Sequence, residues 1–562
     1  MKVFFYLIFL AIGSHKAIIQ FSFLLFDSKL MQQLSEREVR IQKIEKMKSL
    51  WVVPFAQHFN KEQSIEKIVS EYSNKEMREI ESIIPSPEKQ VKTAGRLVLY
   101  RSFGKLSFWT IIDGTNRIQV MFHRDNCKID ISTSADEPKL VDSLWEWEDA
   151  MTAYKFMEKM VDVWDFIGVT WEVFKTHKWE LTIFVPEFKF LSKSVRWLPE
   201  KYHGINDPEE LYRKRYLDMI MNPETYERFL FKSKFYQKLR EFYTKEWFIE
   251  IQTPILDNAA SGAAARPFIT HHNDFDVDVY LRIAFETSLK KATVWRFEKV
   301  FEIGQDFRNE WSDPSHIQEF TQVEHYAVYW NYEDNMKFTE KMFDFLFDEL
   351  KLDRKLKVKD KEWIEKEVDF TTPWKRIDYT KWILEASWID ITQYGVDDAD
   401  KLRNDIKAKW ITFEWIDDMW TTTLIDYLFK KVLRPSIIGP AFIYNYPVIM
   451  QPLARVSDKD DNIVEQFQLL VNGWEICKAY SELVDPLFQQ ANFDKQAEAA
   501  AKWDDEATSW DDAFVEAMEY WMPPQSGFGM GLERILAILT QQENIRDVVM
   551  FPLMKPRNWS EE

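Results

Sequence analysis

One stretch of the chain, residues 301–329, combines residue types that could bind a nucleotide and an amine. A guanidinium binds phosphate, an aromatic ring stacks on a flat base, and a carboxylate pairs with an ammonium group. Because side chains alternate between the faces of a strand, Phe320, Glu324 and Tyr326 are expected to point the same way. An exposed face of satisfied ion pairs is the alternative explanation. The residues concerned are Arg308, Glu310, His316, Phe320, Glu324 and Tyr326.

A second group of candidate residues lies towards the C-terminus. Gly527, Gly529 and Gly531 would allow close backbone approach, and Arg534 follows at the predicted start of a helix, where amides and the helix dipole favour anions. A GxGxG pattern alone is weak evidence, because close packing explains it equally well. Together with Arg308, however, Arg534 offers two guanidinium groups that suit one polyphosphate.

Upstream of these glycines, the segment NGWEICKAYSELVDP carries two carboxylates. Glu475 could hold a hard cation that bridges phosphates, and Glu482 follows on the same segment with Tyr480 between them. No P-loop or dinucleotide-binding glycine motif stands between a strand and a helix, which disfavours those chemistries.

These residues need a sheet to position them. The stretch 301–329 alternates apolar residues on either side of a polar loop, which predicts a long antiparallel hairpin whose first strand ends at Phe307. Further strands are expected in SGAAARPFITHH, DVDVYLRIAFE and residues 442–480, and a helix is expected over 224–245. GFGMGLERILAILT predicts a strand or turn that passes into the last helix. Hairpin-linked strands with packed helices predict an α+β domain over residues 200–562.

Residues 89–199 contain five short alternating strands, which are typical of a β-barrel of the oligonucleotide-binding kind. An acidic, helical insertion is expected over 126–160. Basic residues near Phe103 and Phe108 could bind the backbone and unstacked bases of single-stranded RNA, although such rings more often belong to a barrel core. The basic residues are Lys92, Arg96, Arg101 and Lys105.

The composition narrows the class of protein. A chain of 562 residues is too long for one core, so two or three domains are expected. The net charge of −19 argues against a general nucleic-acid coat but not against tRNA. Only two cysteines occur, Cys127 and Cys477, and their positions indicate neither a disulfide scaffold nor a zinc site, which fits a reducing cytoplasm.

The N-terminus, MKVFFYLIFLAIG, has the length of a signal-peptide core and is too short to span a bilayer. No small-x-small cleavage site follows, and the chain becomes charged and helical from Met31. We therefore interpret residues 1–30 as a hydrophobic extension upstream of a true start at Met31, with a membrane anchor as the alternative. Residues 31–88 are expected to form a helical arm, and no stable membrane association is expected.

Tryptophan and glycine are present in an unusual ratio. The chain has 24 tryptophans and 14 glycines, whereas glycine is usually about 7% of residues. Trp179 falls in a predicted turn and Trp247 at a predicted helix end, where left-handed backbone is usual. Because bulky residues tolerate positive φ badly, we hypothesise that many tryptophans are glycines in the cell, one triplet having been translated with the wrong code.

From about Met31 to its end, the chain resembles a class II lysyl-tRNA synthetase of the bacterial type. PEKYHGINDPEELYRKRYLDMIMNPE resembles the start of that family's catalytic domain and its first motif, and SGAAARPFITHH and YLRIAFE resemble its lysine-site strands. FEIGQDFRNE with EFTQVEHY resembles the second motif, and GFGMGLERILAILTQQENIRDVVMFP resembles the third. The resemblance implies an anticodon-binding barrel before a catalytic antiparallel sheet, in a cytoplasmic homodimer.

The resemblance also implies a reaction. Lysine would attack the α-phosphorus of ATP, with Mg²⁺ as cofactor, and the lysyl-adenylate would pass lysine to tRNA(Lys). Arg308 and Arg534 would be the catalytic residues and would bind ATP with Glu310, His316, Phe320 and Glu475. The implied lysine-binding residues are Gly262, Glu286, Glu324, Tyr326, Tyr480 and Glu482. The implied anticodon contacts are Arg96, Arg101, Phe108 and Gln119.

The chain departs from the family pattern at several positions. The two acidic metal ligands correspond to Gln468 and Glu475, and the usual asparagine beside the lysine site is Lys478. Motif 3 reads GLER, which is closer to the asparaginyl and aspartyl relatives. Tryptophans fall where the family carries glycine at Trp51, Trp164, Trp171, Trp179, Trp247, Trp311, Trp474 and Trp521. Trp330 and Trp374 are expected to be genuine.

Other functions remain alternatives. An asparaginyl- or aspartyl-type synthetase would share the barrel and the motifs, but Glu324, Tyr326 and Glu482 favour a cationic substrate. A ligase that attaches lysine to a protein would not need the RNA-binding barrel. A non-catalytic tRNA-binding paralogue would not need to retain Arg308 and Arg534.

Overall fold

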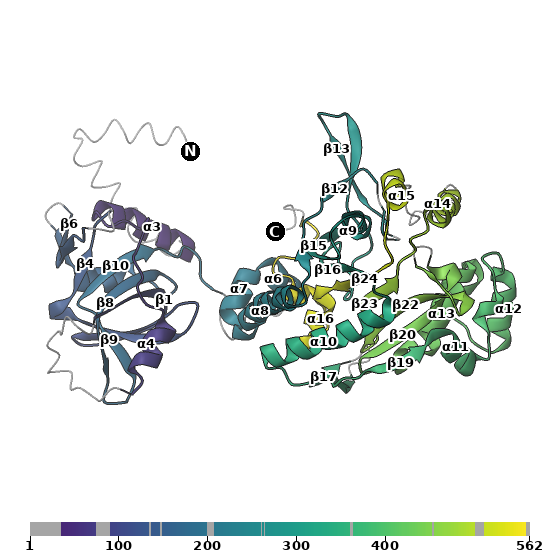
Figure 1. The fold of residues 1–562 in the computed structure, drawn as a ribbon. Coiled ribbons are helices and arrows are strands. Elements are labelled where there is room, and N and C mark those ends of the chain that lie inside the picture. The colour runs from purple at the N-terminus through teal and green to yellow at the C-terminus, as the bar shows by residue number, and fades with distance from the viewer. Residues whose placement is uncertain are drawn as a thin grey trace, which may run out of the picture. The chain divides into compact units, whose positions relative to one another are not determined.

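The computed structural model describes residues 35–74, 90–133, 137–146, 149–198, 207–259, 261–263, 265–359, 364–451, 454–500 and 511–557. The chain divides into two compact units, Met1–Gly204 and Ile205–Glu562 (Figure 1). Each unit has its own hydrophobic core. The interpretation of residues 1–30 concerns a segment outside the described residues.

The first unit is built on one sheet. Its strands include β1 (Gln90–Phe103), β2 (Leu106–Ile112), β3 (Arg117–His123), β8 (Phe166–Lys175), β9 (Leu181–Phe184) and β10 (Glu187–Ser192). The strand order is β1-β2-β3-β9-β8-β10-β4-β5, and β8 also pairs with β1. Along β2 the side chains alternate between buried and half-buried, because one face packs on the core. Two helices, α3 (Glu36–Ser49) and α4 (Ile65–Tyr72), precede the sheet, and both contribute residues to the core of this unit.

The predicted insertion, residues 126–160, differs from expectation. Only α5 (Ala153–Met160) is helical, and most of the rest consists of short strands, β4 (Lys128–Asp130), β5 (Leu140–Val141), β6 (Ser143–Glu146) and β7 (Asp149–Thr152). β4 extends the main sheet through parallel pairing with β10. The helical prediction was wrong for these strands because pairing between distant segments leaves little local periodicity in three- or four-residue strands.

The second unit is organised around a large sheet. Its strand order is β11-β15-β16-β24-β23-β22-β20-β19, with β21 (Val456–Ser457) attached to β22. The central strands, from β15 to β20, pair antiparallel, as predicted. The strands are β11 (Ile249–Glu250), β15 (Lys299–Phe307), β16 (Glu319–Val328), β24 (Gln525–Gly531), β23 (Trp474–Ser481), β22 (Asp460–Val471), β20 (Ala441–Pro447) and β19 (Lys375–Asp378).

Three helices pack on this sheet: α8 (Pro223–Lys245), α10 (Tyr332–Leu350) and α16 (Leu532–Leu539) (Figure 1). The prediction of a helix over 224–245 is confirmed by α8, which begins with Pro223 at the position that needs no amide donor. Buried His325 joins β16 to both neighbouring helices, since Tyr243 donates to its Nδ1 at 2.9 Å and its Nε2 donates to Asn335 at 2.8 Å. Burial lowers the pKa of His325 to about 3, so the ring is neutral.

Smaller elements surround the sheet. A three-stranded sheet of β12 (Leu256–Asp257), β13 (Phe268–His272) and β14 (Val277–Leu281) precedes α9 (Glu286–Thr293). At the β19 and β20 end, α11 (Tyr379–Ser387), α12 (Ala399–Ala408) and α13 (Thr421–Val432) form a separate core. The remaining elements are α6 (Pro208–Arg213), α7 (Arg215–Met221), β17 (Lys355–Lys359), β18 (Glu365–Asp369), α14 (Pro486–Ala500) and α15 (Asp512–Glu519).

Tryptophans occupy many left-handed backbone positions. Six of those matched to glycine from the sequence have positive φ, as do three further tryptophans: Trp51, Trp164, Trp171, Trp179, Trp247, Trp521, Trp388, Trp410 and Trp415. Trp311 and Trp474 do not have positive φ. Trp374 is 5% exposed in the core, and its indole donates to the Phe370 carbonyl at 3.1 Å, which agrees with a genuine tryptophan. The backbone therefore supports the glycine hypothesis at nine positions.

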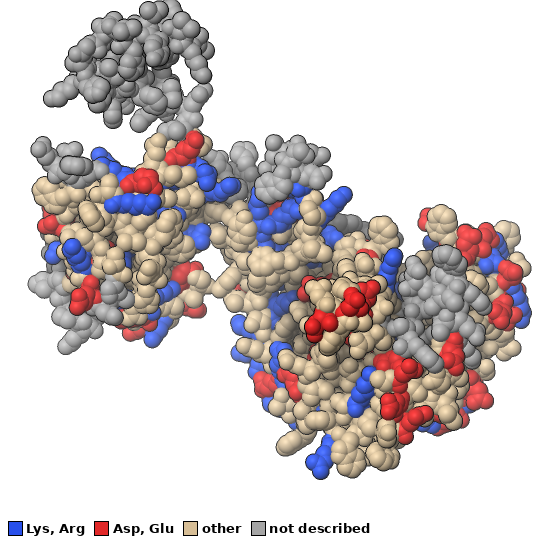
Figure 2. Space-filling model, turned by 90° about the horizontal axis from the view of Figure 1, so that it is seen from above, with Lys and Arg blue, Asp and Glu red and all other residues tan. Residues whose placement is uncertain are grey.

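Within the described part of the chain, no helix is long and apolar enough to cross a membrane. Acidic and basic side chains are intermixed on the faces shown in Figure 2, so the net charge does not produce one continuous surface of a single sign there. Cys127 and Cys477 are both buried and free.

Candidate functional site

The hairpin of β15 and β16 confirms the predicted platform. Its register places Glu302 opposite Glu324, Gly304 opposite Gln322 and Asp306 opposite Phe320. Residues directly opposite each other share a face of the sheet. Phe320, Glu324 and Tyr326 therefore point the same way, as alternation predicted.

Buried carboxyl groups and tyrosines cluster on this face, and this cluster is called the carboxylate pocket below: Glu286, Glu324, Tyr326, Tyr480 and Glu482. The Tyr326 hydroxyl donates to Glu324 at 2.7 Å, and Gln322 donates to the same carboxylate at 3.0 Å. Burial raises the pKa of Glu324, and the charges of Glu286 and Asp306 raise it further. Burial also raises the pKa of Glu482 to about 8, against the opposing effect of the Lys290 ammonium. The pocket thus concentrates negative charge that an ammonium ligand would neutralise.

Glycines create the space for these side chains. A Cβ on Gly527 would lie 2.4 Å from both Glu482 Oε1 and Tyr326 Cε1, and one on Gly529 would lie 2.8 Å from Gln322 Nε2. The predicted close approach is thus found at these two positions but not at Gly531, where an added Cβ would have no neighbour within 4 Å. Gly262, at φ +88°, packs against Glu286, whose Cβ would lie 3.0 Å from an added Cβ.

Arg308 and Arg534 approach each other beside this pocket. The Arg308 guanidinium lies 5.1 Å from the centre of the Phe320 ring, and its Nε donates to the Ile283 carbonyl at 3.2 Å. Arg534 donates to the Ser315 carbonyl at 3.3 Å and to the Glu475 carbonyl at 3.1 Å. Burial lowers the pKa of Arg534, and the charge of Arg308 contributes in the same direction. Two neighbouring guanidinium groups make an anion site.

The loop between the two strands holds the other predicted nucleotide residues. Glu310 and His316 are both exposed, and His316 Nδ1 lies 2.7 Å from Asp313 Oδ2. Trp311 is 94% exposed and points outward. The Ser315 carbonyl accepts from Arg534, and the charge of Asp313, which His316 contacts, raises the pKa of Arg534 against the effect of burial. This part of the loop therefore lies near Arg534, although the Glu310 and His316 side chains are exposed.

Sequence reasoning missed three buried charged residues at the site. Asp306 is fully buried, neither of its carboxylate oxygens has a hydrogen-bond partner, and burial raises its pKa to about 7 against the charges of Arg308 and Arg282. Arg282 donates to Glu302 at 2.8 Å. Lys290 pairs with Glu286 and Glu482. Only the spacing of four residues between Glu286 and Lys290 was a signal in the sequence, and it is equally typical of surface ion pairs.

The implied metal position offers a single carboxylate, that of Glu475. Gln468 accepts a hydrogen bond from the Tyr446 hydroxyl at 2.7 Å, and Lys478 donates to Gln451 at 2.7 Å. No cluster of three or more His, Cys, Asp or Glu side chains that could hold a metal occurs among the residues described. Glu475 therefore fits a Mg²⁺ ion that takes its other ligands from phosphates and water, and not a site built by the protein alone.

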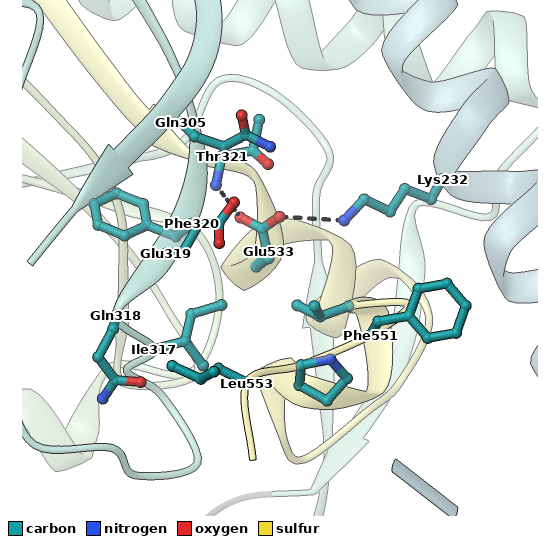
Figure 3. Close-up of a pocket in the computed structure, with 12 residues that line it drawn as sticks. Lys232, Gln305, Ile317, Gln318, Glu319, Phe320, Thr321, Glu533, Phe551 and Leu553 are labelled. Carbon is teal, nitrogen blue, oxygen red and sulfur yellow. Dashed lines mark hydrogen bonds and ion pairs between the residues drawn. The ribbon is translucent and has the colours of Figure 1, made fainter. Parts of the chain in front are cut away.

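A cavity of about 170 Å³ borders the opposite face of the hairpin (Figure 3). Gln305 and Thr321, which line it, alternate with the residues that face the carboxylate pocket. Glu533 accepts from the Thr321 amide at 2.8 Å and from Lys232 at 3.1 Å. This cavity is therefore distinct from the carboxylate pocket, although Phe320 also borders it.

In the first unit, the implied anticodon residues share one face of the sheet. Arg101 lies opposite Phe108, and Gln119 lies opposite Thr110, two residues along β2 from Phe108. Arg96 lies opposite Ile112, which follows on the same face. An irregularity between Leu97 and Leu99 shifts the alternation of β1, so an even- and an odd-numbered arginine reach the same side.

Comparisons with known proteins agree with this geometry. Residues 207–555 match the family model described as tRNA synthetases class II (D, K and N), so the chain belongs to this class of synthetases. Its relatives include a lysine–tRNA ligase of Carboxydothermus hydrogenoformans, 37% identical over 94% of this chain and 99% of the relative. One of Aquifex aeolicus is 39% identical over 89% of this chain and 79% of the relative. The chain is a member of the lysine–tRNA ligase family.

Proposed function

We propose that this protein joins L-lysine to tRNA(Lys) with the consumption of ATP. The observation that carries the proposal is the position of a buried carboxylate pocket beside the Arg308 and Arg534 pair. The first suits the side-chain ammonium of lysine and the second suits the phosphates of ATP. Phe320, on the same face, offers a ring for adenine. An aspartate side chain would add negative charge to the pocket, which disfavours the aspartyl-type alternative.

The chemistry follows from position and electrostatics. Glu482, Glu324 and Tyr326 hold the lysine side chain so that its carboxylate faces the α-phosphorus of ATP. Attack forms lysyl-adenylate, and pyrophosphate leaves while Arg308 and Arg534 stabilise charge on the phosphates. The terminal ribose hydroxyl of tRNA then takes the lysyl group and AMP leaves. Glu475 would help to hold Mg²⁺, which would supply further positive charge for the phosphates.

We extend the proposal to the domains. Residues 31–88 form an arm, residues 89–199 an oligonucleotide-binding barrel and residues 200–562 the catalytic domain. The pairing of β1 with both β2 and β8 supports a closed barrel, and the shared face of Arg96, Arg101, Phe108 and Gln119 supports anticodon binding.

A cytoplasmic homodimer belongs to the same proposal. Ile249, Ile255 and Leu256 are each 44% or more exposed beside edge strand β11. Exposed apolar residues near a sheet edge support an association surface.

Lysine-dependent exchange of pyrophosphate into ATP tests the activity. We expect exchange with lysine and not with aspartate or asparagine. Arg308→Ala should lower kcat/KM by about 10²–10³, the usual effect of removing a group that stabilises developing charge. Lys357→Ala is the control, because Lys357 pairs with Glu365 on the surface away from both guanidinium groups. Unchanged exchange in Arg308→Ala would refute the assignment.

A further inference from the structure

Lys290 places an ammonium group of the protein itself inside the carboxylate pocket. The side chain is 1% exposed, and its Nζ donates to Glu286 Oε1 at 2.6 Å and pairs with Glu482. The same Nζ lies 5.8 Å from the ring centre of Tyr326 and 5.6 Å from that of Tyr480. No role in the reaction described above uses this residue.

The surroundings of Lys290 hold it firmly. Glu286 and Lys290 lie one helical turn apart on α9, so the helix fixes their separation. Burial lowers the pKa of Lys290, but Glu286 and Glu482 outweigh burial, so the pKa is raised and the ammonium stays charged. The charged or titratable groups that face this region come from α9, β16 and β23 with the residue after it: Glu286, Glu324, Tyr326, Lys478, Tyr480 and Glu482.

We propose that Lys290 is a positioning residue for the lysine site, which holds Glu286 and Glu482 in place and favours their ionised forms when the ammonium groups of the substrate bind. This inference rests on the proposed function. Three carboxylates, Glu286, Glu324 and Glu482, lie close enough to influence one another. Without an internal cation, like charges at such spacing would favour protonation of these groups still further.

The number of charges in the pocket supports Lys290 as a permanent partner of the carboxylates and not as a competitor of the substrate. Once lysine binding has ionised the three carboxyl groups, three carboxylates with one internal ammonium carry two net negative charges, and lysine brings two ammonium groups. Lys478, the other lysine that faces the region, is engaged by Gln451, and burial lowers its pKa. Lys290 therefore adjusts the pocket to the charge of the substrate while its own side chain stays between Glu286 and Glu482.

Pyrophosphate exchange with Lys290→Met, Lys290→Arg and Lys291→Met tests the inference. Lys291, the matched control, is partly exposed on the same helix and pairs with Asp511. In Lys290→Met we expect the KM for lysine to rise about tenfold or more, with the KM for ATP within twofold. The pH at which 1/KM for lysine is half-maximal should move up by about one unit, because the carboxylates lose their internal cation. Lys290→Arg should fall between Lys290→Met and the wild type.

An unchanged or lower KM for lysine in Lys290→Met, with the wild-type pH profile, would overturn the inference. If that variant does not fold, the double variant Lys290→Met with Glu286→Gln removes one charge of each sign. Its pH profile should then resemble that of the wild type, and a profile shifted upward would overturn the inference. Absence of lysine-dependent exchange in the wild type would instead reject the proposed function.

Discussion

We expect Glu482 to make lysine binding dependent on pH. Its pKa is raised to about 8, chiefly by burial, so the folded protein holds a proton on Glu482 at neutral pH that the unfolded chain releases near its ordinary pKa of 4.5. This carboxyl group therefore favours the folded state at low pH, and that contribution disappears as pH rises from about 4.5 to about 8. The substrate lysine is expected to bind the ionised form of Glu482. The stabilisation of the folded protein by bound lysine should therefore increase as pH rises.

We expect the affinity for lysine to rise about tenfold per pH unit between pH 6 and pH 8 and then to level off, because each unit below the pKa adds the cost of removing one proton. Isothermal titration calorimetry at several pH values measures the affinity. Glu482→Gln should bind lysine weakly and without this pH dependence. An affinity that stays constant from pH 6 to pH 8 would contradict the role of Glu482.

At the residue scale, the sequence was informative where residue type alone points to chemistry. Arg308, Phe320, Glu324 and Tyr326 could be selected because their strand alternation is local. Asp306 could not be selected, because its burial depends on Arg282 and on packing by distant segments. The proximity of Lys290 and Glu482 likewise depends on tertiary packing between distant segments, which no local pattern encodes.

At the scale of elements, the strand β24 depends on its glycines to different degrees. Gly527→Ala should place a methyl group against Glu482 and Tyr326, raise the KM for lysine at least tenfold and lower the free energy of unfolding by about 1–3 kcal/mol. Gly531→Ala is the matched control in the same strand, because an added Cβ there meets nothing within 4 Å. Exchange kinetics and chemical denaturation of both variants give these values, and equal effects at the two positions would contradict the explanation.

The tryptophans with positive φ give a second prediction for elements, since eight of the nine lie at turns or helix ends and Trp171 lies within strand β8. We expect mass spectrometry of the protein from its native cell to find glycine at the nine positions with positive φ. A recombinant protein with glycine at all nine should be more stable than one with tryptophan, by about 1 kcal/mol for each position. Trp374→Gly, in the core, should instead destabilise by about 3–5 kcal/mol. A native protein with all 24 tryptophans would reject the hypothesis.

Long, strongly periodic elements were predictable, whereas elements that depend on distant partners were not. In the hairpin of β15 and β16 and in helix α8, the periodic pattern of apolar residues lies within the segment itself. The irregularity at Leu97–Leu99 reverses the alternation of β1, and only pairing with β2 reveals it. β19 is four residues long and pairs in parallel with β20, which lies more than 60 residues later, so its neighbourhood gave no signal.

At the scale of the whole molecule, the two units have independent cores. Every buried residue in the core of the first unit lies before Gly204. The second unit has one core on the large sheet and another at the β19 and β20 end, and every buried residue of both lies after Ile205. Cores that share no residues can fold separately. The carboxylate pocket and the guanidinium pair lie entirely within the second unit, whereas the implied anticodon face lies entirely within the first.

We expect this division to separate the two half-reactions. A fragment of residues 205–562 should fold and retain lysine-dependent pyrophosphate exchange within about tenfold of the whole protein, because adenylate formation uses only groups in that unit. Its transfer of lysine to tRNA(Lys) should fall much further, at least 100-fold in kcat/KM, because the fragment lacks the surface of Arg96, Arg101 and Phe108 that would bind the anticodon. Whole protein with Arg101→Ala and Phe108→Ala is the control for truncation: it should keep full exchange and lose transfer alone. If the fragment folds, as judged by cooperative unfolding, yet loses both reactions equally, the second unit does not contain a complete site for activation.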